Sequence, residues 1–123
     1  MKIIYKTNKI EKQCTSFNDA KKLFGGNASL AISLLSRINA LKGAETIKDI
    51  IVQPQFHFHD LHNKARRNLD GFFAIDVKTR RDKWRIIIQP LDENENPYRP
   101  CNIDQIANVV RVVEVTEVSK HYE

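Results

Sequence analysis

The spacing of apolar residues changes along the chain, and this change limits the folds that the chain can adopt. In the N-terminal third, apolar side chains recur every three or four positions, as on one face of a helix. Later segments are short and rich in aromatic and β-branched residues, which is typical of strands. Helices first and strands later predict an α+β fold with a twisted, mainly antiparallel sheet packed on helices. A length of 123 residues predicts a single domain covering 1–123.

The N-terminal part is expected to contain a short strand, at residues 2–7, and a helical hairpin. Apolar residues predict a first helix over 9–24, which starts in a capping box at Asn8 and ends at a pair of glycines. Asn27 is expected to cap the second helix, which closes near residue 43. The apolar stripe of this second helix is Leu30, Leu34, Ile38 and Leu41.

The remaining elements are expected to be strands joined by polar segments. The candidate strands are residues 56–59, 71–77, 84–91 and 109–118. A turn at 79–82 joins the middle two, and a polar loop with two prolines covers 92–102. The segment 103–108 is either a helical turn or a lead-in to the last strand.

Positive charge is concentrated in one part of the chain. The formal net charge is +5, and residues 64–85 hold eight Lys and Arg against three acids, which accounts for all of it. Such a patch favours an anionic partner, either nucleic acid or an acidic protein.

The compartment is expected to be the cytoplasm. The two cysteines, Cys14 and Cys101, form no disulfide framework and are expected to be free thiols in a reducing environment. The first residues lack the apolar region of a signal peptide, and no apolar run is long enough for a membrane span.

Three of the four histidines lie within residues 56–67, together with three cationic side chains. If this segment is a strand, His57 and His59 point to the same face, as metal ligands would. The order of residues resembles a scrambled form of the H-x-H-x-D-H zinc motif, but Asp60 comes one place early and the surroundings are cationic. We therefore expect no metal and no other cofactor.

The same residue types suit phosphate chemistry. Histidine exchanges a proton near neutral pH, and Arg and Lys bind phosphate. Together they could cleave RNA without a metal, although a solvated basic hairpin is the plainer interpretation. Arg85 is the lone charged residue in the apolar segment 84–88, and we expect it to point either into a cleft or along a solvent-facing side of the sheet.

The order of motifs resembles the RelE/HigB-like toxins of type II toxin–antitoxin systems. After the helical region come H-x-L at 59–61, G-x-F-A-I-D-V at 71–77 and W-R-I-I before Pro90. A final strand at 112–115 and the pair His121-Tyr122 complete the likeness over nearly the full length. The basic segment after His59 is longer than the family's usual L-x-G-x-R-x-G turn and lacks its first glycine.

The resemblance implies a ribosome-dependent endoribonuclease (mRNA interferase) that arrests growth by cutting mRNA through attack of a 2′-hydroxyl. It implies a cognate antitoxin, with a helix-turn-helix domain through which the complex binds operator DNA. The alternatives are a ParE-like inhibitor of DNA gyrase without nuclease activity, and a basic interaction domain without catalytic activity. The catalytic residues carried over are Arg85, His59, His62 and His121. The residues expected to bind phosphate or RNA are Lys64, Arg66, Arg67, Arg81, Lys83 and Tyr122.

Overall fold

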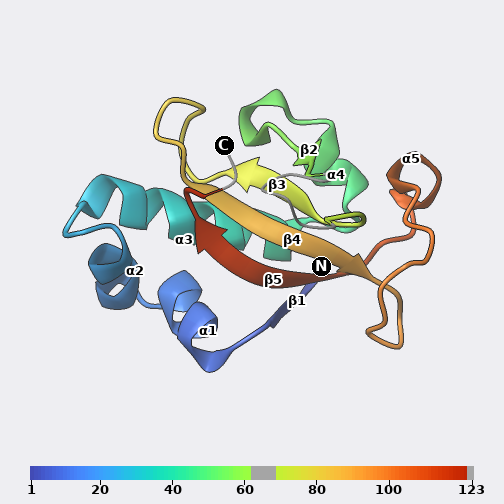
Figure 1. Ribbon diagram of the computed structural model, residues 1–123, viewed down its shortest axis with the longest axis horizontal. Coiled ribbons are helices and arrows are strands. Elements are labelled where there is room, and N and C mark those ends of the chain that lie inside the picture. The colour runs from blue at the N-terminus through green and yellow to red at the C-terminus, as the bar shows by residue number, and fades with distance from the viewer. Residues whose placement is uncertain (62–68, 122–123) are drawn as a thin grey trace.

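A computed structural model describes residues 1–61 and 69–121 of the chain. Within them, one mixed sheet has the strand order β1-β5-β4-β3-β2. The edge strand β1 (Lys2–Tyr5) runs parallel to β5 (Val112–Ser119), and the other three pairings are antiparallel. The other strands are β2 (His59–Asp60), β3 (Phe73–Asp76) and β4 (Arg85–Leu91). The prediction of an α+β fold with a mainly antiparallel sheet is confirmed (Figure 1).

The N-terminal helical region is divided differently from the prediction. In place of one helix over 9–24, the chain forms α1 (Asn8–Thr15) and α2 (Phe17–Leu23), so the prediction of one continuous helix was wrong. Ser16, with φ −115° and ψ 124°, interrupts the helical backbone, and its hydroxyl accepts a hydrogen bond from the Asp19 amide. Serine favours such local bonds to the backbone over a place inside a helix, which explains the break.

The cap predicted for the first helix was also wrong by one residue, whereas the cap of α3 was right. Thr7, and not Asn8, accepts a hydrogen bond from the Ile10 amide at the start of α1. Asn27 Oδ1 accepts from the Leu30 amide at 3.0 Å and begins α3 (Ala28–Gly43). Between α2 and α3, Gly25 and Gly26 have φ values of 62° and 92°, which glycine adopts without strain.

Three shorter segments complete the chain. They are α4 (Lys48–Ile51), a 3₁₀ turn at Pro54–Phe56, and α5 (Ile103–Ile106), which resolves the segment 103–108 in favour of a helical turn. The amides of Val109 and Val110 bond back to the Ile106 carbonyl. The last strand therefore starts at Val112 and not at Val109 as predicted.

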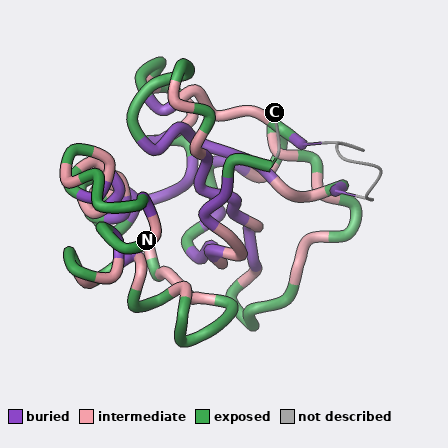
Figure 2. Tube along the Cα trace, turned by 60° about the vertical axis from the view of Figure 1, so that its left-hand side comes forward, coloured by how far each residue is buried: buried purple, intermediate pink, exposed green. Residues whose placement is uncertain are grey.

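The two faces of the sheet carry different side chains. Alternate residues of β3 and β4, such as Ile75 and Ile86, join α3 in the main core with Leu34, Ile38 and Leu41. The opposite face carries a smaller cluster of Leu61, Leu69, Ala74 and Ile87. Figure 2 shows the buried segments gathered in the middle of the molecule. Because side chains alternate along a strand, Asp76 and Arg85 lie on the second face, away from the main core.

None of the helices in the described ranges is long and apolar enough to cross a membrane.

Replacing Asn27 with alanine is expected to lower the free energy of unfolding by about 1 kcal/mol, because the first turn of α3 loses its side-chain cap. The exposed Asn39, in the interior of the same helix, is the matched control, and Asn39→Ala is expected to be neutral or slightly stabilising. Urea unfolding followed by circular dichroism measures both. If both variants lost the same free energy of unfolding, the Asn27 cap would contribute nothing to stability.

Candidate functional site

The segment that precedes β2 is not the strand that the sequence predicted. Pro54 begins a 3₁₀ turn that ends at Phe56, and His57 then adopts a left-handed backbone conformation with φ 50° and ψ 49°. The strand holds only His59 and Asp60, so the prediction that His57 and His59 share a strand face was wrong. The two imidazoles nevertheless meet, because their rings stack with centroids 4.4 Å apart.

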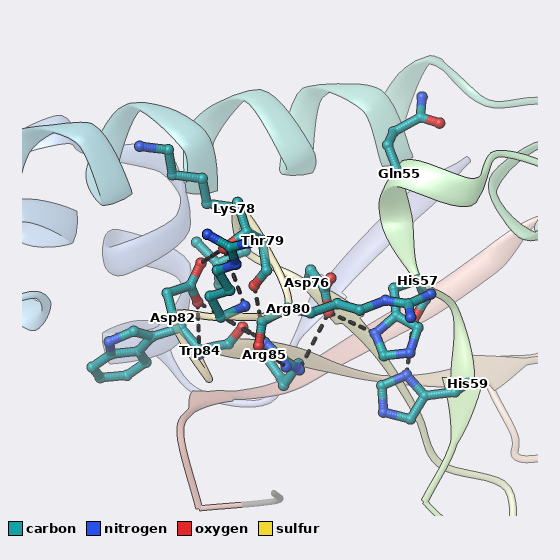
Figure 3. A network of polar contacts seen from close by, with 12 residues as sticks. Gln55, His57, His59, Asp76, Lys78, Thr79, Arg80, Asp82, Trp84 and Arg85 are labelled. Carbon is teal, nitrogen blue, oxygen red and sulfur yellow. Dashed lines mark hydrogen bonds and ion pairs between the residues drawn. The ribbon is translucent and has the colours of Figure 1, made fainter.

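His57 is bound to a buried carboxylate. Its Nδ1 lies 3.0 Å from Oδ1 of Asp76, whose side chain is 3% exposed, while the His57 side chain is 29% exposed. The same Oδ1 lies 3.2 Å from Nε of Arg85 on the neighbouring strand, an ion pair and not a well-aligned hydrogen bond. A chain of contacts therefore runs from a partly exposed imidazole through a buried carboxylate to a buried guanidinium (Figure 3).

The partners of both histidines fix their protonation pattern. Nδ1 of His59 lies 2.7 Å from the His57 carbonyl oxygen, which can only accept, so this nitrogen carries the proton. Nδ1 of His57 likewise donates to the Asp76 carboxylate. In each neutral ring the Nε2 atom then holds the lone pair. The Nε2 atom of each ring is therefore left to accept a hydrogen bond or a proton.

Arg85 differs from both expectations, because it neither enters an open cleft nor lies along a solvent-facing surface. Its side chain is 2% exposed. Besides the contact with Asp76, its Nη1 donates to the Trp84 carbonyl at 2.8 Å and its Nη2 to the Arg80 carbonyl at 3.0 Å. A longer bond reaches the Thr79 carbonyl at 3.4 Å. These bonds hold the guanidinium against the carbonyl groups of the β3–β4 turn and of Trp84.

The β3–β4 turn, residues 78–83, presents positive charge to solvent. Asp82 shapes it by accepting from the Thr79 and Trp84 amides, each at 2.8 Å. The exposed cationic residues of the turn are Lys78, Arg80, Arg81 and Lys83. Arg81 and Lys83 were predicted from the sequence to bind RNA, and both side chains are exposed to solvent. Lys78 donates to Ser29 on α3.

The C-terminal end of β5 lies beside this site. Ser119 pairs with Arg85 in register, and its hydroxyl accepts a hydrogen bond from the His121 amide at 3.0 Å. The predicted residue His121 is therefore at the same end of the sheet as Asp76 and Arg85, and it is exposed. No contact among the described residues joins it to His57 or His59. The other predicted residues, His62, Lys64, Arg66, Arg67 and Tyr122, lie outside the described residues.

Two residues of the candidate site, Asp76 and His57, were not predicted from the sequence. Neither Asp76 nor His57 is among the residues predicted to be catalytic or to bind RNA, and His57 was considered only as a metal ligand beside His59. The signal was present, because Asp76 is the lone charged residue of the apolar segment 71–77. An acid in such a strand needs a buried partner, and Arg85 occupies the equivalent place in the next strand.

Other chemistries find less support among the described residues. They contain no group of three or more His, Cys, Asp and Glu side chains placed to hold a metal ion. Burial raises the pKa of the Cys14 thiol to about 12, and burial also raises the pKa of Cys101. Neither thiol is therefore activated as a nucleophile.

Comparisons with known proteins add no relative, since no family model, curated protein or solved structure matches the chain.

Replacing Arg85 with methionine is expected to lower the free energy of unfolding by about 3–5 kcal/mol, because the Asp76 carboxylate stays buried without its cation. Arg81→Met, at an exposed position of the adjoining turn, should change it by no more than about 0.5 kcal/mol. The double variant Asp76→Asn/Arg85→Met should lose less free energy of unfolding than the two single variants lose together. Additive losses in urea unfolding would show that the two side chains are not coupled.

Proposed function

We propose that the chain is the toxin of a type II toxin–antitoxin system of the RelE/HigB-like group, a metal-independent endoribonuclease that cuts mRNA on the ribosome. The observation that supports this most is the pair of stacked imidazoles backed by the buried Asp76–Arg85 ion pair. The Asp76–Arg85 ion pair lies at the end of the sheet from which the exposed, cationic β3–β4 turn projects.

The proposed reaction uses the 2′-hydroxyl of the RNA as nucleophile. One imidazole takes the hydroxyl proton through Nε2, and the 2′-oxygen attacks the adjacent phosphorus. The bond from phosphorus to the 5′-oxygen breaks, and a protonated group gives a proton to that leaving oxygen. The products are a 2′,3′-cyclic phosphate and a 5′-hydroxyl. The Asp76–His57 pair suits the base, and His59 or His121 is the candidate acid.

Arg85 was predicted to be catalytic, and a direct contact of its guanidinium with the scissile phosphate stays a prediction. Its buried guanidinium instead favours an indirect contribution, in which it orients Asp76 and fixes the turn. The exposed cations of the turn then bind the phosphate, and these are Arg80, Arg81 and Lys83. Fixed positive groups beside the reacting phosphate stabilise the charge that develops on its oxygens.

A toxin of this kind needs an inhibitor, so the proposal includes a cytoplasmic antitoxin partner with a helix-turn-helix domain. The antitoxin would cover the cationic site and bring the complex to operator DNA. A short reading frame for such a protein beside this gene, whose co-expression restores growth, is the matching genetic observation.

Replacing His57 or His59 tests the chemistry. His57→Ala and His59→Asn are each expected to lower the rate of mRNA cleavage in a translating extract by about 10²–10⁴-fold, since each removes a proton-transfer group. An asparagine amide can still donate to the His57 carbonyl, so His59→Asn separates proton transfer from positioning. Cleavage is measured by primer extension with EDTA-treated protein, and growth arrest is followed in parallel.

Gln55→Ala, at an exposed position of the same segment, is the control and should cleave as well as wild type. Folded His57→Ala and His59→Asn proteins with full activity would exclude the two imidazoles from the reaction. Growth arrest with intact mRNA and a DNA damage response would instead point to gyrase inhibition. Harmless expression of folded wild-type protein would point to an interaction domain.

A further inference from the structure

A second cationic surface lies on the N-terminal helices. A groove of about 490 Å³ runs between α1 and α2 and is not part of the imidazole site. Its lining residues are Lys9, Lys12, Gln13, Asp19, Lys22 and Leu23. Three of these six side chains are lysines that converge from two helices, and we call the hollow the lysine groove.

The lysines of this groove are available to a partner. Lys9, Lys12 and Lys22 are exposed, and none of the three forms an ion pair with a described carboxylate. Asp19, the one acid in the lining, follows the Ser16 cap in the first turn of α2. Three ammonium groups against one carboxylate leave the lining with net positive charge, which an anionic ligand would offset.

Aromatic and cationic contacts join the end of α2 to Trp84, which follows the β3–β4 turn. Phe24, at the end of α2, packs edge-on against Trp84 with ring centroids 4.8 Å apart. On the same indole, Nζ of Lys120 lies 5.8 Å from the ring centroid. Trp84 directly precedes Arg85 in the chain, but its side chain packs on Phe24 in the main core, on the opposite face of the sheet from Arg85. Figure 1 shows the N-terminal part of α3 between the turn and α2.

We propose that the lysine groove binds the phosphodiester backbone of a single-stranded nucleic acid. With the cationic turn it forms one track along this end of the molecule, past Lys120 and the last turn of α2. The continuity of the track with the cleavage site rests on the proposed function, whereas the binding in the groove does not.

A phosphodiester strand fits this groove better than an acidic peptide does. Five exposed lysines spread over α1, α2 and the segment between β1 and α1, and a polymer with regularly spaced charges can meet them in turn. These lysines are Lys6, Lys9, Lys12, Lys21 and Lys22.

The test measures binding of a fluorescent 2′-O-methyl RNA, which cannot be cut by 2′-hydroxyl attack, so binding is read apart from cleavage. In the triple variant Lys9→Gln/Lys12→Gln/Lys22→Gln, Kd is expected to rise about tenfold to a hundredfold near ~0.1 M salt. The slope of log K against log salt should shrink by roughly 2, which is about 0.7 for each lost phosphate contact.

The control variant Lys2→Gln/Lys48→Gln/Arg111→Gln removes the same charge from exposed positions outside the groove. This control should bind RNA with nearly the wild-type Kd and the wild-type salt dependence. A variant with arginine in place of the three groove lysines should also bind like wild type. Equal losses in the groove and control variants would overturn the proposal, because net charge alone would explain binding. A groove that binds polyglutamate and not RNA would overturn it in favour of an acidic protein partner. If the groove result holds while His57→Ala cleaves normally, the proposed cleavage mechanism fails and the groove stands.

Discussion

The ion pair between Asp76 and Arg85 is the interaction on which the proposed site depends. It joins two central strands, both side chains are almost fully buried, and each charge would be costly there without the other. Each side chain of the ion pair also holds a second group in place. Asp76 holds the His57 imidazole, and Arg85 holds the carbonyls of the turn that carries the exposed cations. One buried pair thus sets the geometry of the proton-transfer groups and of the cationic turn together.

The sequence predicted a catalytic role for Arg85, and the burial of its guanidinium beside Asp76 bears on that role. A guanidinium that binds phosphate has to be reachable, and a guanidinium that neutralises a buried carboxylate has to be enclosed. Arg85 does the second. The exposed arginines of the turn and the lysines of α1 and α2 can then serve the first task, which is consistent with an extended anionic ligand at this end of the molecule.

Much of the fold could be predicted from the sequence because its signals are local. Periodicity placed α3 and the central strands, and Asn27 marked a cap through a bond to an amide three residues away. The break at Ser16 was missed because the apolar spacing continues through it. The left-handed turn at His57 was missed because a short aromatic segment reads as a strand whatever its backbone does. The partnership of His57, Asp76 and Arg85 depends on pairing across strands, which no local pattern reveals. The histidine-rich segment holds both imidazoles of the candidate site, but the contact of His57 with Asp76 was not predicted.

The central claim is that the two imidazoles promote attack by a 2′-hydroxyl on the RNA backbone. The most direct test is a translated mRNA that carries a single 2′-deoxynucleotide on the 5′ side of a mapped cut. The account predicts that cutting at that position disappears, while the unmodified mRNA yields a 2′,3′-cyclic phosphate and a 5′-hydroxyl. Undiminished cutting of the deoxy-substituted mRNA, with a 3′-hydroxyl and a 5′-phosphate at the new ends, would contradict it.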